Sequence, residues 1–166
     1  TYSATISACE KGGQWEKALW LLDQMQGASV KPDVITYNAT ISACEKDGQW
    51  EKALWLLDQM QGASVKPGVI TYNATISACE KGGQWEKALW LLKQMHGAGM
   101  KPNVITYSAT ISACEKAGQW EKALWLLKQM RRAGMKPNVI TYSATISACE
   151  KGGQWEKALW LLKQMR

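Results

Sequence analysis

A segment of 35 residues occurs five times along this chain with almost no change. The first copy opens at Thr1 with the sequence TYSATISACE, and the others open at Thr36, Thr71, Thr106 and Thr141. The constant spacing leaves no room for an insertion. A fixed period of this length is typical of a repeat array, in which each unit buries its apolar face against its neighbours instead of around one central core.

The period divides the chain into a single array of five units, at residues 1–35, 36–70, 71–105, 106–140 and 141–166, the last of them incomplete. Natural arrays usually end in atypical capping units with a polar outer side, and no unit here has that character. We therefore expect the chain to be a piece of a longer array, with any targeting segment outside it.

The first half of each unit has the pattern of a short amphipathic helix. In the second unit three apolar residues recur at positions i, i+4 and i+7, namely Tyr37, Ile41 and Cys44. Pro32 lies just upstream and disfavours helix before it, so we expect Thr36 to act as the N-cap. Gly48 ends the helix, because glycine readily adopts the left-handed conformation found at helix C-termini.

The second half of each unit predicts a second helix, which in the second unit begins near Gln49 or Trp50 and ends at Gly62. Its predicted core face consists of Trp50, Ala53, Leu54, Leu57 and Met60. Short links on both sides make neighbouring helices antiparallel. The sequence therefore predicts an all-α array of helix-turn-helix units.

One tryptophan per unit lies on the side of this second helix opposite the core face, among charged and amide residues. We call this set the tryptophan ridge; it consists of Trp20, Trp55, Trp90, Trp125 and Trp160. Exposed apolar rows usually mark a contact surface, so protein docking is one interpretation. Two others stay open: each indole lies flat on its own helix against the lysine three residues earlier, or nucleic-acid bases stack on it.

Charge is unevenly placed in a chain with a formal net charge of +6. Residues 1–70 carry six Lys/Arg against eight Asp/Glu, whereas residues 71–166 carry fourteen against six. Much of this difference comes from one position of the unit, where Asp23 and Asp58 give way to Lys93, Lys128 and Lys163. The C-terminal part is therefore the better candidate for holding a polyanion.

Catalytic chemistry has little support in the sequence. The single histidine, His96, stands in a turn where other units have Gln or Arg, and no glycine-rich phosphate loop occurs. The five cysteines are one position repeated, spaced too far apart for disulfides and without a metal-binding pair. No apolar run is long enough to span a membrane. We expect no enzyme, cofactor, metal or small-molecule substrate.

Several segments together resemble the pentatricopeptide repeat family, in its P-type units of 35 residues. They are the Val-Ile-Thr-Tyr-Asn opening of the first helix, the Gly-Gln-Trp-Glu-Lys-Ala-Leu opening of the second, and the Lys-Pro-Asp/Asn link. Tetratricopeptide repeats have a similar plan but are one residue shorter. The resemblance covers the whole chain and implies a right-handed α-solenoid superhelix that binds single-stranded RNA with one base per repeat.

The resemblance also implies which residues select each base. The first base-selecting position follows Thr-Tyr in each unit and holds Ser3, Asn38, Asn73, Ser108 and Ser143. The second follows Lys-Pro at the end of the unit and holds Asp33, Gly68, Asn103 and Asn138. The isoleucines implied to sandwich the bases are Ile35, Ile70, Ile105 and Ile140. The first and second base-selecting positions vary in an otherwise near-identical array, as selection of different bases would require.

By the same resemblance Ser3 with Asp33 favours guanine, Asn73 with Asn103 a pyrimidine, and Ser108 with Asn138 adenine. Asn38 departs from the pattern because Gly68 has no side chain, so we expect only a weak pyrimidine preference there. Ser143 lacks its partner and indicates a purine. The implied ligand is about 5′-GYYAR-3′, parallel to the chain, in a chloroplast or mitochondrion, for RNA processing, stability, editing or translation.

Two alternatives remain at this point. Interchange of Ser and Asn at a solvent-facing helix start is also what neutral drift produces, because both residues suit such positions. The array could instead be a structural subunit that docks onto a large organellar assembly, such as a ribosome or a membrane complex, through the tryptophan ridge. RNA binding and scaffolding therefore stand as two hypotheses.

Overall fold

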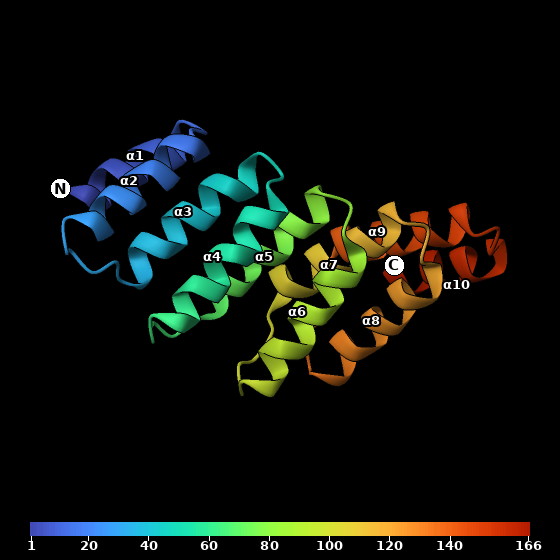
Figure 1. Cartoon of the computed structure of the whole chain (residues 1–166). Helices are drawn as coiled ribbons and strands as arrows, with labels where there is room; N and C mark the ends of the chain where they lie inside the picture. The colour runs from blue at the N-terminus through green and yellow to red at the C-terminus, as the bar shows by residue number, and fades with distance from the viewer. The chain divides into compact units, whose positions relative to one another are not determined.

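The computed structural model describes all of residues 1–166 and contains ten α-helices and no strand, which confirms the all-α prediction (Figure 1). Each repeat contributes one A helix and one B helix. The A helices are α1 (Tyr2–Lys11), α3 (Val34–Lys46), α5 (Val69–Lys81), α7 (Val104–Lys116) and α9 (Val139–Lys151). The B helices are α2 (Trp15–Gly27), α4 (Trp50–Gly62), α6 (Trp85–Gly97), α8 (Trp120–Arg132) and α10 (Trp155–Met165).

The start of the A helix differs from the prediction. Helix α3 begins at Val34, and its N-cap is Asp33, whose backbone is extended and whose carboxylate accepts the backbone N–H of Thr36 at 3.0 Å. The prediction that Thr36 is the N-cap is therefore wrong. Asp33, directly after Pro32, has the extended backbone of an N-cap residue. An N-cap side chain accepts the backbone N–H of the third helical residue, and Thr36 is that residue.

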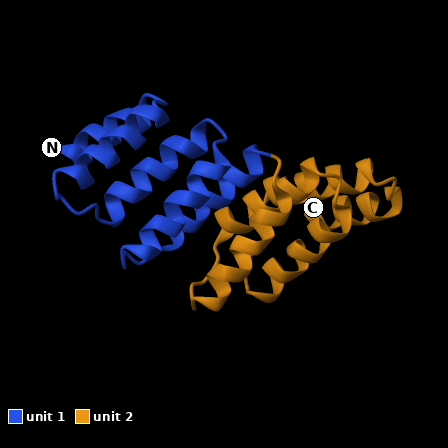
Figure 2. Ribbon diagram, viewed as in Figure 1, with its two compact units in different colours: residues 1–82 blue, residues 83–166 orange.

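The chain forms two compact units, residues 1–82 and 83–166 (Figure 2). In the first unit α3 packs between α1 and α5, so the A helices form a layer. Helix α2 packs against α1 and α3, and α4 packs against α3 and α5, but no backbone contact joins α2 to α4. Both B helices of this unit therefore lie over the seam between two A helices.

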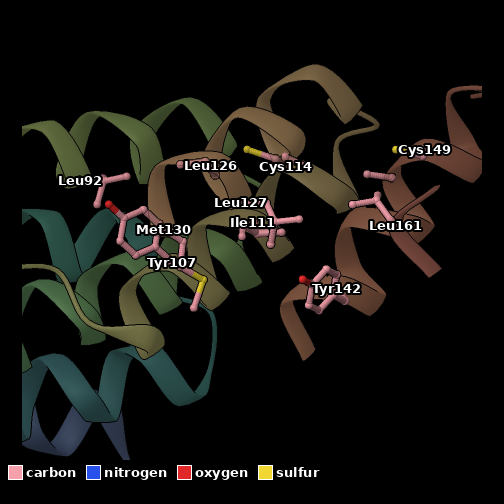
Figure 3. Close-up of a cluster of buried hydrophobic side chains, with 12 residues drawn as sticks. Leu92, Tyr107, Ile111, Cys114, Leu126, Leu127, Met130, Tyr142, Cys149 and Leu161 are labelled. Atoms are coloured by element: carbon pink, nitrogen blue, oxygen red, sulfur yellow. The ribbon is translucent and has the colours of Figure 1, made fainter. Parts of the chain in front are cut away.

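The second unit repeats this arrangement. Helix α7 packs against α6, α8 and α9, and α9 packs in turn against α8 and α10. Its core cluster comes from both layers and includes Tyr107, Leu126, Met130 and Leu161 (Figure 3). The first unit has an equivalent cluster around Tyr37 and Met60.

A wider face of the B helix is buried than the sequence predicted. Leu56 is fully buried, whereas Leu54, which was assigned to the core face, is only half-buried. The reason is that α4 contacts two A helices, its own and the next, so its buried face extends around the helix on one side. Leu91 and Leu126 are the buried equivalents in the second unit.

The tryptophans that open the B helices mostly pack as predicted. Trp15 and Trp50 lie half-buried against the core of the first unit, and Trp85 and Trp120 against that of the second. The ammonium of Lys157, one repeat on, lies 5.2 Å from the Trp120 ring. Trp155 is different, with 67% of its surface exposed.

The cysteines are free thiols, and four of the five are buried. Figure 3 shows Cys114 and Cys149 at separate places in the cluster of the second unit. Burial raises the pKa of Cys44 and of Cys114 to about 11. No group of His, Cys, Asp or Glu side chains is arranged to hold a metal ion, and no helix has the length and apolarity that a membrane span requires.

Candidate nucleic-acid interface

The two base-selecting positions occupy fixed places in the A-helix layer. The first position lies in the second turn of each A helix for α3, α5, α7 and α9, and near the start of the shorter α1. The second position is the N-cap of the following A helix. Asp33, Asn103 and Asn138 are exposed, Gly68 is half-buried, and the first positions range from the exposed Ser143 to the buried Asn73.

Ser3 and Asp33, which are 30 residues apart, meet at one buried threonine of the next repeat. The hydroxyl of Ser3 lies 3.0 Å from the hydroxyl of Thr36. That hydroxyl in turn donates to Oδ1 of Asp33 at 2.9 Å. Thr36 is fully buried. The fold therefore brings together the two side chains that the resemblance pairs.

The next junction repeats the arrangement with a different second residue. The hydroxyl of Thr71 donates to Oδ1 of Asn38 at 2.6 Å. The backbone N–H of Gly68 donates to the same Thr71 hydroxyl at 3.1 Å. Asn38 therefore meets the N-cap residue of the next A helix although Gly68 has no side chain.

The second unit contains two further caps of this kind. Asn103 Oδ1 accepts the backbone N–H of Thr106 at 3.1 Å, and Asn138 Oδ1 accepts that of Thr141 at 3.0 Å. The Thr141 hydroxyl donates to the Asn138 carbonyl at 2.9 Å. Ser108 and Asn138 thus lie at the same junction of repeats, but no hydrogen bond joins Ser108 to Thr141 as one joins Ser3 to Thr36.

These threonines were not among the site residues expected from the sequence. Their signal was present, because every N-cap residue of an A helix after the first is followed by threonine three positions later, as Asp33 is by Thr36. That spacing is typical of reciprocal capping at a helix start, and the structure has it at α7 and α9. At α5 only the half made by the Gly68 N–H is present.

The four isoleucines beside the N-caps point into solvent. The exposed fractions of Ile35, Ile70, Ile105 and Ile140 are 64%, 71%, 60% and 64%. An isoleucine this exposed contributes little to folding, and a row of them forms an apolar surface available for contact. Each lies two residues after a second base-selecting position, at the N-terminal end of an A helix.

Charges of the A-helix layer are largely paired. Lys46 pairs with Glu10 of the preceding repeat at 2.8 Å, Lys81 with Glu45 at 2.7 Å, and Lys151 with Glu115 at 2.6 Å. The carboxyl of Asp33 has a lowered pKa because the backbone and the side chain of Thr36 donate hydrogen bonds to it. It is therefore an ionised acceptor at neutral pH.

The excess positive charge lies elsewhere. The first unit carries seven Lys/Arg against nine Asp/Glu and the second thirteen against five. The lysines that replace aspartate, Lys93, Lys128 and Lys163, are exposed on the B helices α6, α8 and α10. The charge that favoured the C-terminal part as a polyanion site is thus largely on the B-helix layer and not beside the base-selecting positions.

The tryptophan ridge also belongs to the B-helix layer. Its members have exposed fractions between 46% and 60%. Trp55 borders a groove between α2 and α4, about 430 Å³ in volume, with Leu19, Asp23 and Glu51. In the second unit Trp125 borders a groove of about 380 Å³ between α6 and α8, with Leu92, Lys93 and Arg132. The first groove is lined by Asp23 and Glu51 together with Lys52, and the second by Lys93 and Arg132 with no carboxylate, so the charge of the two grooves differs.

These features define the class: an α-helical repeat protein in which the first-position residue of one A helix and the N-cap of the next meet within a unit. Family comparison gives the same result for the whole length. The description "Pentatricopeptide repeat domain" matches residues 90–152, "PPR repeat family" matches 1–46 and 32–81, and "PPR repeat" matches 70–100 and 140–166. The chain belongs to the pentatricopeptide repeat family.

Solved structures of the family resemble the chain closely. The pentatricopeptide repeat protein PPR10 from maize is 32% identical with a TM-score of 0.77, over 99% of this chain and 24% of that one. PPR10 in complex with an 18-nt psaJ RNA element is 28% identical with a TM-score of 0.75, over 99% and 28%. The chain thus spans about a quarter of the length of PPR10.

A third similar structure supports the fold alone, because its sequence identity is low. It is the PPR domain of Arabidopsis thaliana protein-only RNase P 1 in complex with tRNA, 20% identical with a TM-score of 0.87, over 100% of this chain and 90% of that one. A comparison with curated proteins finds no match.

Proposed function

We propose that the chain binds single-stranded RNA through its A-helix layer, with one base per repeat and a preferred sequence of about 5′-GYYAR-3′. The observation that carries this proposal is the meeting of Ser3 and Asp33 at Thr36, beside the exposed Ile35. Polar groups for a Watson-Crick edge and an apolar surface for a base plane therefore lie together, as recognition of unpaired bases requires. PPR10, which is similar over nearly the whole chain, was solved in complex with RNA.

Each pair then has its own preference. Ser3 with Asp33 selects guanine, Asn73 with Asn103 a pyrimidine, and Ser108 with Asn138 adenine, while Ser143 indicates a purine. Asn38 with Gly68 gives a weak pyrimidine preference, because only one side chain contacts the base. The isoleucines Ile35, Ile70, Ile105 and Ile140 separate neighbouring bases. Five repeats give weak, salt-dependent binding, because few contacts offset the ordering of a flexible strand.

The test uses fluorescence anisotropy with a labelled strand containing 5′-GUUAG-3′ and with a scrambled strand of the same composition. We expect the first to bind more tightly at low salt. Equal affinity for both strands, or no binding of either, would contradict the proposal.

The chain itself offers a matched recoding variant. Asp33→Asn makes the first pair identical to Ser108 with Asn138, so the preference for the first base should change from guanine to adenine. The substitution is nearly isosteric and keeps an acceptor for the Thr36 N–H. A binding preference that stays with guanine would show that this pair does not select the base.

We place this activity in an organelle, a chloroplast or a mitochondrion, where it serves RNA processing, stability, editing or translation. The support is the similarity to PPR10 together with the family resemblance of the repeats. Imaging a fluorescent fusion of the full-length protein tests the location. A purely cytosolic or nuclear signal would contradict it.

A second candidate function is docking of a protein through the tryptophan ridge. The observation that favours it is that all five indoles are about half exposed, in a layer separate from the base-selecting positions. Density-gradient sedimentation of the tagged protein in an organelle extract would compare the wild type with a variant in which all five ridge tryptophans are changed to Glu. If the variant still co-migrates with a large complex, docking through the ridge is ruled out.

A control variant adds charge to three of these five helices without touching the ridge. Gln24, Gln59 and Gln94 are exposed on α2, α4 and α6, and their replacement by Glu should leave sedimentation unchanged. The added negative charge weakens RNA affinity in both variants, but base preference should be unchanged, because the ridge is not in the A-helix layer.

A further inference from the structure

The direction of hydrogen-bond donation at the repeat junctions is fixed by the buried threonines. A threonine hydroxyl has one proton to donate, while its oxygen can accept. Thr36 and Thr71 are both fully buried, so protein groups decide where this proton goes. The two junctions of the first unit differ in this respect.

At the first junction the threonine proton goes to the carboxylate. Asp33 is an ionised acceptor, and the Thr36 hydroxyl donates to it at 2.9 Å. The contact of 3.0 Å between the Ser3 and Thr36 hydroxyls must then use the proton of Ser3, because Thr36 has none left. Ser3 is therefore held as a donor toward Thr36 and presents only lone pairs to a ligand.

At the second junction the direction is reversed. The N-cap residue Gly68 has no acceptor side chain, and its backbone N–H donates to the Thr71 oxygen. The Thr71 proton goes instead to the amide oxygen of Asn38, at 2.6 Å. This hydrogen bond turns the amide oxygen of Asn38 toward Thr71, so the NH₂ is the side of the amide left to face a ligand, and it only donates.

We propose that Thr36 and Thr71 are positioning residues that set the donor or acceptor character of the neighbouring base-selecting side chain. This inference rests on the proposed function and adds two residues that never touch the RNA. The N-cap residue acts on the first position through the threonine. A carboxylate accepts the threonine hydroxyl proton, so that Ser3 must donate, and a glycine leaves this proton for the amide oxygen of Asn38.

The chemistry of the bases agrees with these two states. Ser3 and Asp33 together present acceptors, which match the adjacent N1–H and N2–H donors of guanine. Adenine offers an acceptor, N1, at the same edge and is rejected. Asn38 presents donors, which match a pyrimidine carbonyl oxygen. Threonine at the same position of the repeat can therefore serve both preferences, because the hydroxyl protons of Thr36 and Thr71 are directed to different acceptors.

The experiment removes one hydroxyl at a time and measures selectivity, not affinity alone. In Thr36→Val the Ser3 hydroxyl is free to rotate and can donate to adenine, so the ratio of Kd values for strands beginning with A and with G should fall by about five-fold, the effect of one hydrogen bond. In Thr71→Val the Asn38 amide is free to turn over, and the preference for U over A at the second base should fall similarly. Neither change should alter the preference at the other base.

Two controls separate positioning from general loss of structure. Thr36→Ser keeps the hydroxyl and should restore the guanine preference. Thr40 is equally buried in the same helix, and its hydroxyl donates to the Thr36 carbonyl at 2.8 Å without contacting either base-selecting position. Thr40→Val should therefore leave selectivity unchanged while having a similar effect on stability.

The outcomes distinguish the two proposals. A wild-type chain without base preference at the first position contradicts the proposed function itself. If the wild type prefers guanine but Thr36→Val keeps that preference, or if Thr40→Val removes it to the same extent, the positioning role of Thr36 is wrong while RNA binding stands. Loss in Thr36→Val with rescue by Thr36→Ser supports it.

Discussion

The ammonium of Lys46, near the end of α3, lies 2.8 Å from the Glu10 carboxylate near the end of α1, one repeat earlier. The same glutamate oxygen accepts from the Ser42 hydroxyl at 3.2 Å. Lys81 with Glu45 and Lys151 with Glu115 repeat this pair. In the first unit, adjacent A helices are therefore joined near their C-terminal ends by ion pairs and near their N-terminal ends by hydrogen bonds to the buried threonines.

Lys46→Gln should lower the free energy of unfolding by about 0.5 kcal/mol, because the pair is partly exposed and such pairs contribute little. Urea unfolding at low salt measures the loss, which should shrink in high salt as screening weakens the pair. Lys11 is the matched control, since it has the same place in α1 and forms no ion pair in the structure. An equal loss in Lys11→Gln would contradict this account.

The two tryptophans of one B helix should respond oppositely to removal. Trp50 packs half-buried against the core, so Trp50→Ala should cost about 2 to 3 kcal/mol, below the full cost for a buried tryptophan. Trp55 is 51% exposed, and Trp55→Ala should stay within about 0.5 kcal/mol of the wild type. Thermal unfolding followed by circular dichroism compares them. A larger loss for Trp55 would mean that the ridge is structural.

Gly68→Asp should both stabilise the chain and change base selection at the second base. The Gly68 backbone is extended, with φ of −110°, and a side chain added there meets no atom within 4 Å. A carboxylate would accept the Thr71 N–H as Asp33 does for Thr36, for a gain of about 0.5 kcal/mol in unfolding free energy. The same carboxylate would draw the Thr71 proton away from Asn38, so RNA titration should show a changed base preference at the second base and no change at the first. Unaltered discrimination there would count against a role for the N-cap residue.

Ser64→Gly should raise the free energy of unfolding by about 0.5 to 1 kcal/mol. Ser64 has a positive φ of 59°, in the left-handed region that is costly for residues other than glycine. The third and fourth repeats already have glycine at this place, Gly99 and Gly134. The reverse change, Gly99→Ser, should destabilise by a similar amount in denaturant unfolding, and a change of the same sign in both variants would refute the strain.

Cys9 should be the first thiol to react with iodoacetamide at pH 8, because it is only half-buried. Burial raises the pKa of Cys44 and Cys114 to about 11, so almost no thiolate forms there, and peptide mapping by mass spectrometry should find them unlabelled. A raised folded pKa gives stability that is complete below the unfolded value near 9 and is lost as pH rises toward 11. Urea midpoints constant between pH 9 and 11 would contradict this linkage.

The helices and their buried faces were predictable because they depend on local spacing. The apolar positions of Tyr37, Ile41 and Cys44 all proved to be buried. The prediction failed at the start of the helix, where Asp33 and not Thr36 is the cap. Either residue type suits an N-cap, and only the backbone conformation distinguishes them. It also failed at Leu56, whose burial depends on a second A helix packing against α4.

The sequence by itself determined the repeat, the two helices of each unit and the positions at which units vary. These follow from residue types at short, regular spacings along one helix. Only the tertiary structure decided that Ser3 and Asp33 meet at Thr36, and that the excess lysines lie on the other layer of helices. Both depend on how one helix is shifted and rotated against the next. Side-chain packing between repeats sets that arrangement, and the periodicity within one repeat carries no information about it.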